Sequence, residues 1–111
     1  MPYDKVLADR IRKALGRQPS LTEKEMFGGV GFLIRGNMAC GVHGREMIVR
    51  VGPAAHAEAL GEAYVRPFDL SGGRPAKGWV LVKPAGVKSP AALKKWVERG
   101  VAFAKSLPAK K

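Results

Sequence analysis

The chain has 111 residues, a length that fits one domain, and 46% of them are apolar, which is enough to build one hydrophobic core and favours a folded chain over a disordered one. Lysine and arginine outnumber the acids by 20 to 9. The resulting net charge of +11 favours polyanionic partners, although the same charge would also keep a small protein soluble. We therefore expect residues 1–111 to form a single basic domain.

Targeting signals and disulfides are not expected. The amino terminus lacks the basic segment and apolar run of a signal peptide. No apolar run approaches the roughly 20 residues that span a bilayer. Cys40 is the sole cysteine and lies in an apolar alternation, which is typical of a small buried side chain. The expected location is cytoplasmic, without membrane contact.

The first element is predicted to be a helix over residues 4–15. Asp4 is a plausible cap, and Gly16 can end the helix with a positive φ. Charged side chains occupy the opposite face. The apolar stripe recurs every four residues, at Tyr3, Leu7, Ile11 and Leu15.

Four strands in an antiparallel meander should follow this helix. Alternating apolar residues predict the second, third and fourth of them, and Gly36-Asn37 suits a two-residue hairpin turn because both residues tolerate positive φ. His43-Gly44-Arg45 predicts the next turn. The first strand is polar, as expected at a sheet edge. The predicted ranges are 22–27, 30–34, 38–42 and 47–51.

The second half of the chain should add a short helix, one or two strands and a long helix. Pro53 would start the short helix, which runs to residue 60 or 61. Residues 65–70 could pair briefly, residues 71–78 read as a loop, and residues 79–83 read as a strand. Ser89-Pro90 strongly predicts the start of the last helix. Gly100 in its middle indicates a close backbone approach.

The predicted fold class is α+β, with a mainly antiparallel sheet of about five to six strands, two long terminal helices and one short helix. The order of elements is α-β-β-β-β-α-β-α. One core should lie between the sheet and the two long helices, formed by Phe27, Phe32, Val49, Val80, Trp96 and Val97.

Five sequence blocks in order carry a family resemblance. They are Met26–Ala39, Val49–Pro53, Arg66–Asp69, Lys77–Val80 and Leu93–Val97. Together they resemble the amino-terminal domain of the TfoX/Sxy competence-regulator family over nearly the whole chain. The resemblance implies the same layout and assigns a structural role to the motif residues Met26, Phe27, Gly28, Gly29, Gly36 and Trp79.

The resemblance also implies a role near transcription control. TfoX/Sxy proteins promote transcription of competence genes, and protein contacts are the expected means. The full-length regulators carry a second, helical carboxy-terminal domain, whereas this chain stops at Lys111. The competence role is therefore not carried over to this chain.

No residue pattern indicates a catalytic step, a metal or a cofactor. The glycines at 28, 29 and 31 precede a strand rather than a helix, so they favour a bend or bulge over a nucleotide site. Cys40, His43 and His56 are too few and too poorly spaced for a zinc site. The serines lie in turn, loop, cap and helix-end contexts. We expect no catalytic residues, no metal and no cofactor.

Two basic groups are the candidate binding sites. The first comprises Arg74 and Lys77 in the predicted loop, with Arg66 nearby in sequence and Trp79 beside them, an arrangement that could grip phosphates and stack a base. The second runs along the first helix. In the alternative interpretation Trp79 anchors the core and the cations are merely exposed. The second group consists of Arg10, Lys13 and Arg17.

The sequence thus predicts a non-enzymatic regulatory or protein-interaction domain. Its partner would be an unidentified protein, with the transcription machinery as one candidate, and the domain would be a monomer or a homodimer. The alternative is a weak, sequence-tolerant nucleic-acid-binding protein, which the net charge supports. Steep loss of affinity with salt would distinguish the second function from the first.

Overall fold

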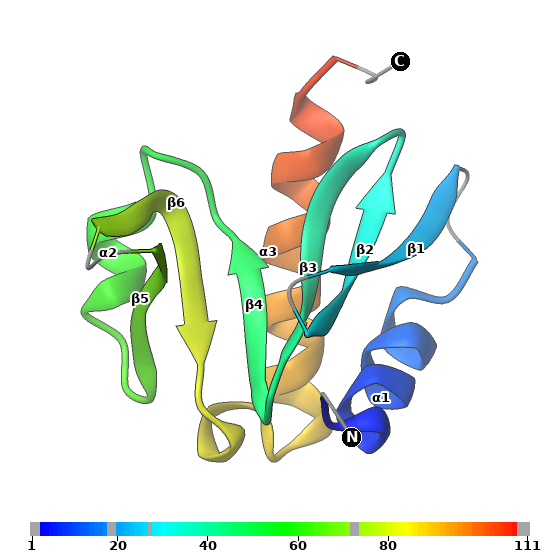
Figure 1. The fold of residues 1–111 in the computed structure, drawn as a ribbon, viewed down its shortest axis with the longest axis horizontal. Helices are drawn as coiled ribbons and strands as arrows, with labels where there is room; N and C mark the ends of the chain where they lie inside the picture. Colours follow the sequence, from blue (N-terminus) through cyan, green and yellow to red (C-terminus); the bar gives the residue numbers. More distant parts are fainter. Residues whose placement is uncertain (1–2, 18–19, 27, 72–73, 109–111) are drawn as a thin grey trace.

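The computed structural model describes residues 3–17, 20–26, 28–71 and 74–108. Within them it contains a six-stranded antiparallel sheet of order β1-β2-β3-β4-β6-β5 (Figure 1). The predicted α+β class and the order of elements are confirmed. The elements are α1 (Lys5–Leu15), β1 (Leu21–Met26), β2 (Gly29–Ile34), β3 (Asn37–His43), β4 (Glu46–Arg50), α2 (His56–Leu60), β5 (Val65–Ser71), β6 (Arg74–Val82), a 3-10 turn η1 (Pro84–Val87) and α3 (Pro90–Ser106).

Helix ends form where the sequence places capping residues. The Asp4 carboxylate accepts hydrogen bonds from the backbone N–H groups of Val6 and Leu7, at 3.0 and 3.1 Å. At the start of α3, Ser89 Oγ accepts from the N–H of Ala92 at 3.1 Å. Gly16 ends α1 with φ 60°. These contacts satisfy N–H groups that have no partner within the helix, and they confirm the predicted helix boundaries.

The helices all pack on one face of the sheet, and the main core lies there. α1 and α3 cross behind the strands in Figure 1, and α2 covers the end formed by β5 and β6. Strand residues of alternate parity face these helices. The predicted core is confirmed for every residue except Phe27, which lies outside the described residues. The confirmed residues, all buried, are Phe32, Val49, Val80, Trp96 and Val97.

The β2–β3 hairpin turns one residue earlier than predicted. Ile34 pairs with Asn37, so the two turn residues are Arg35 and Gly36, with φ 53° and 83°. Asn37 belongs to β3, where its Nδ2 donates to the Pro108 carbonyl oxygen at 2.8 Å. This part-buried bond ties Asn37 of β3 to the segment after α3, and Arg35 takes the left-handed conformation in the turn.

The predicted glycine bend before β2 is replaced by two separate features. Gly28 has φ 73° in the connection from β1, whereas Gly29 is a regular residue of β2. The irregularity lies further on, where Phe32 pairs with Cys40 and Leu33 with Met38. Ala39 is therefore the extra residue of a β-bulge in β3.

The prediction of a loop over residues 71–78 is wrong. β5 continues to Ser71 and β6 begins at Arg74, so most of this segment belongs to a hairpin. Gly78 lies within β6 with φ 89°, and its carbonyl oxygen accepts from the N–H groups of Val51 and Gly52 at 2.8 and 3.1 Å. Strand pairing thus overrides the local preference of a Gly- and Pro-rich segment. The short helix α2 also differs, because it starts at His56 rather than at Pro53.

Candidate binding surface

The sheet face turned away from the helices is the candidate binding surface, and we call it the open face. The register identifies its residues: Glu23 of β1 is bonded to Arg12 of α1, so Lys24 and its neighbours of the same parity point the other way. In the described part of the chain, every helix contributes its buried residues to the main core on the opposite side. The open face therefore carries no helix.

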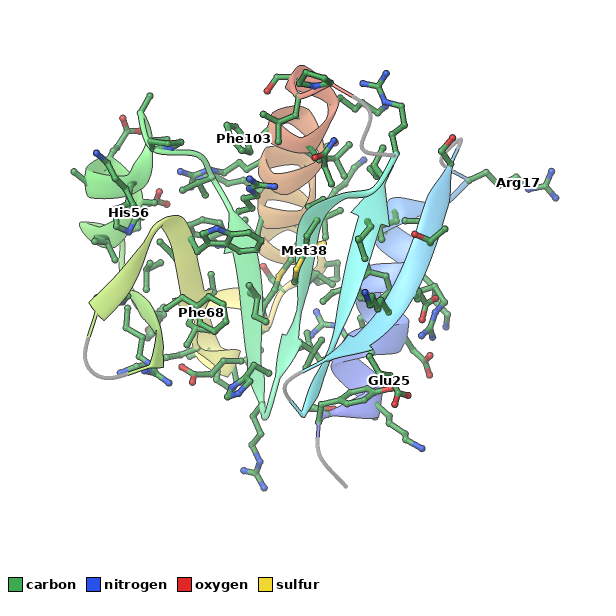
Figure 2. The ribbon with its side chains drawn as sticks, turned by 45° about the horizontal axis from the view of Figure 1, so that its top comes forward. Arg17, Glu25, Met38, His56, Phe68 and Phe103 are labelled. Carbon is green, nitrogen blue, oxygen red and sulfur yellow. The ribbon has the colours of Figure 1, made fainter. Side chains whose placement is uncertain are left out.

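A second apolar cluster lies on the open face. Ile48, Phe68 and Leu81 are buried there, and Met38 and Trp79 are half-buried against them. Figure 2 shows Met38 and Phe68 on the side of the sheet away from α3. The rings of Phe68 and Trp79 lie 6.3 Å apart between centroids and are tilted by 50°. Apolar side chains on both faces are typical of a sheet that is covered on both sides.

Arg50 lies at the rim of the open face, where β4 ends. Its guanidinium is 5.0 Å from the centroid of Trp79 and 5.3 Å from that of Phe103 in α3. Two rings thus hold the cation by its attraction to their π-electrons. No carboxylate pairs with Arg50 among the residues that the structure describes. An arginine held in this way keeps its N–H fork ready for a carboxylate or phosphate oxygen.

The opposite rim carries an ion pair. Arg66 Nε donates to Glu46 Oε2 at 2.8 Å, and Arg66 Nη2 bonds the other carboxylate oxygen. This bidentate bond lowers the pKa of Glu46 below its ordinary value of 4.5. His43 lies beside the pair and approaches Phe68 edge-on at 6.2 Å between centroids. Glu46, the acid of this rim, is therefore neutralised by Arg66.

The first predicted basic group is only partly brought together. Arg66 lies on the open face and is bonded to Glu46, and Lys77 is exposed on β6. Trp79 lies in the second apolar cluster. The backbone of Arg74 belongs to β6, and its side chain lies outside the described part of the structure, as does that of the motif residue Met26. The cations are thus presented by a paired hairpin and not by a glycine-rich loop.

The second predicted basic group lies on the helix side of the sheet. Arg10 is half-buried, and its Nη2 donates to the Lys88 carbonyl oxygen at 3.1 Å. Lys13 is exposed on α1, and Arg17 follows that helix and points outward in Figure 2. The structure therefore separates this stripe from Arg66 and Lys77, and the two groups do not form one continuous basic surface.

The potentially reactive side chains are dispersed. Cys40 is fully buried in the main core, and this burial raises the pKa of its thiol to about 12. His56 Nε2 is buried without a hydrogen-bond partner. Across the described ranges, no three His, Cys, Asp or Glu residues gather in a way that could hold a metal ion. None of the helices in those ranges combines the length and the apolar character needed to cross a membrane.

Sequence reasoning missed the residues that make the open face apolar. The sequence contained a signal for this face, because Ile48 and Leu81 alternate with the core residues of their own strands and are apolar as well. Leu33 and Met38 repeat the same pattern on β2 and β3. Two-sided hydrophobicity in several neighbouring strands indicates a sheet with a second apolar face. Arg50 shares that parity and could have been found with them.

Comparison with known proteins gives one family match. The model of the TfoX N-terminal domain matches residues 13–104, which is most of the chain. No match was found among curated proteins or among solved structures. The matched range begins within α1 and ends within α3, so it contains every strand of the sheet and the whole open face. The chain belongs to the TfoX N-terminal domain family.

Proposed function

We propose that this protein is a non-enzymatic binding domain that contacts a protein partner through the open face, in a role linked to transcription control. The observation that supports this function is the second apolar cluster on a sheet face without a helix. Burying half-exposed Met38 and Trp79 against a partner would remove more apolar surface from water, at about 25 cal/mol per Å². The family membership is consistent with a regulatory role.

Site-specific photo-cross-linking in cells tests this function. Lys24 is exposed on the open face, and Lys13 is an exposed lysine on α1, so a benzophenone amino acid at each position gives a matched pair. We expect a discrete protein adduct from position 24 and none from position 13. The adduct is identified by mass spectrometry and then reproduced with purified components.

The other outcomes of this experiment are equally informative. A protein adduct from position 13 alone would overturn the proposed surface. An adduct between two copies of this chain from position 24 would show that the open face is a homodimer interface. A nucleic-acid adduct from position 24 would favour the second function.

The second candidate function is weak, sequence-tolerant binding of nucleic acid. The net charge of +11 supports it. Its test is a salt titration with a fluorescein-labelled oligonucleotide. We expect binding at micromolar affinity or weaker at low salt, lost by about 200 mM salt because phosphate contacts release counterions. Sequence-selective binding that survives such salt would contradict this form of the function.

A further inference from the structure

One row of residues crosses the open face from edge to edge, and we call the line that it marks the path. Two glycines follow Lys24 in this row, so β2 and β3 contribute no side chain from the row itself there. Buried aliphatic residues follow, and a cation closes each end. In the register of the sheet the row reads Lys24, Gly31, Gly41, Ile48, Leu81 and Arg66.

The length of this path suits a helix of moderate size. Six neighbouring strands are separated by five spacings of about 4.8 Å, so the row is about 24 Å long. A helix rises about 1.5 Å per residue, so about 16 residues would cross the face. Leu33 and Met38 lie one pair further along the strands with half-buried side chains, and the Met38 side chain also reaches over Gly41.

The backbone of the face decides between a helix and an added strand. The N–H and C=O groups of β2, β3, β4 and β6 are used in ladders on both sides. A segment lying on this face therefore finds no backbone partners and must satisfy its own hydrogen bonds. A helix does this internally, whereas an extended strand does not.

Charge favours an acidic occupant. Arg50 has no carboxylate partner in the described part of the chain, and Lys24 is exposed at the other side of the face. Glu46, an acid on the same face, is already paired with Arg66. The net charge of +11 would steer an acidic segment toward the molecule and repel a basic one.

The aromatic residues argue against a single nucleic-acid strand as the occupant. Binding of unpaired bases needs ring faces that stand free for stacking. Phe68 is only 6% exposed, and the ring of Trp79 is approached by Arg50 and Phe68. The remaining cluster is aliphatic. An apolar helix stripe, with carboxylates beside it, fits these contacts better than a row of bases.

We propose that the open face binds an acidic amphipathic helix of a partner protein, with its apolar stripe on the second apolar cluster and a carboxylate on Arg50. This inference rests on the proposed function and specifies the partner's chemistry. The helix would lie across the strands, between Lys24 and Arg66.

Binding of designed peptides measured by fluorescence anisotropy tests the proposal. The probe is a fluorescein-labelled 18-residue peptide with leucine and phenylalanine at helical i, i+3, i+4, i+7 spacing and glutamate and glutamine elsewhere. A matched peptide has alanine at every apolar position, and an 18-nucleotide oligo-dT supplies charge without a helix. In 150 mM salt, we expect the first peptide to bind at least tenfold more tightly than either control.

Charge variants locate the bound peptide. Lys24→Glu and Arg50→Gln should each weaken binding at least fivefold, and Lys13→Glu on α1 should change it less than twofold, because charges are screened beyond about 8 Å at this salt. Thermal unfolding checks whether Arg50→Gln is folded. Lys24 is exposed on the edge strand β1, so its variant tests the site even if Arg50→Gln unfolds.

Three results would overturn the proposal. They are equal binding of the leucine and alanine peptides, tighter binding of oligo-dT, and equal effects of the changes at positions 24 and 13. If the peptide does not bind while the cross-link from position 24 still captures a protein, the proposal of a helical partner is wrong and the proposed binding function stands. If both experiments fail, the function itself is wrong.

Discussion

Gly100 of α3 packs directly against Ala39, the bulge residue of β3. A Cβ at position 100 would lie 3.0 Å from the Ala39 carbonyl carbon and closer still to its oxygen. The bulge directs this carbonyl toward the helix, and glycine is the residue that leaves room for it. α3 and β3 are thereby held at a separation that no other residue at position 100 would permit.

Gly100→Ala should destabilise the protein although alanine is the better helix former. The helix preference gains about 1 kcal/mol, whereas forcing a methyl group against a backbone carbonyl costs about 1–3 kcal/mol and must move the helix. Because the clash is with backbone atoms, the cost should lie near the upper end of this range, and we expect a net loss of about 1–2 kcal/mol in urea unfolding. Gly61→Ala is the control, because its Cβ would meet its nearest neighbour, the Glu58 carbonyl oxygen, at 3.4 Å. Equal stability of wild type and Gly100→Ala would show that α3 does not approach β3 so closely.

Trp96→Ala should cost about 3–5 kcal/mol, as is typical of deleting a large buried ring. Trp96 is 5% exposed in the main core, and Arg99 covers its outer side at 4.3 Å from the ring centroid. Trp79→Ala removes the same ring from the half-buried cluster and should cost clearly less. Denaturant unfolding of both variants measures the difference. A smaller effect at position 96 than at position 79 would contradict the assignment of the main core to the helix side.

Local signals predicted the two long helices well and the β5–β6 hairpin poorly. Asp4 and Ser89-Pro90 act within one turn of chain, so the helix starts can be predicted from sequence alone. Gly78 looked like part of a loop, yet its positive φ belongs to a strand that bonds Val51 and Gly52. That pairing joins residues far apart in sequence, and no local pattern contains it.

The open face could be predicted only in part, for a related reason. Alternation assigns Ile48 and Leu81 to the face opposite their core neighbours, but it does not say whether a helix will cover that face. The open face stays uncovered because α1 and α3 both pack on the other side of the sheet. The cation–π contact of Arg50 depends partly on Phe103, which belongs to α3 and lies 53 positions later in the chain.

Position 78 tests whether the 74–78 segment is packed. Gly78→Ala places a side chain on a residue with φ 89°, and its Cβ would lie 3.1 Å from the Gly52 carbonyl carbon and the Pro53 nitrogen. We expect a loss of about 1–3 kcal/mol from backbone strain and crowding. Lys77→Ala, one residue earlier and exposed, should stay within about 0.5 kcal/mol. If both changes leave urea unfolding unaltered, the segment is not part of the paired sheet.

Low pH should lower the stability of the folded protein, partly through protonation of Glu46. The bond from Arg66 lowers the pKa of Glu46 in the folded state, so this pair stabilises the fold above about pH 4.5 and the contribution is lost as the pH falls through the lower folded value. The pair is partly exposed, so its contribution should be at most about 1 kcal/mol. Glu46→Gln should therefore be less stable than wild type at pH 7, and the difference in stability should narrow as the pH falls below about 4.5. Glu25→Gln, at an exposed site on β1, is the control, and a difference that does not narrow as the pH falls would point to a packing effect instead.

Cys40 should be unreactive until the core opens, and its labelling then reports on Gly100. The thiol is buried, its pKa is raised to about 12, and its Cβ is 3.6 Å from the position of a Cβ at residue 100. Because only the thiolate reacts, iodoacetamide at pH 8 should label the native protein through unfolding alone, far more slowly than free glutathione. When closing is faster than labelling, the rate follows the unfolded population, so each 1.4 kcal/mol lost in Gly100→Ala speeds labelling about tenfold. Labelling of wild type as fast as glutathione would mean that the region between β3 and α3 is open to solvent, which would contradict the contact between Gly100 and Ala39.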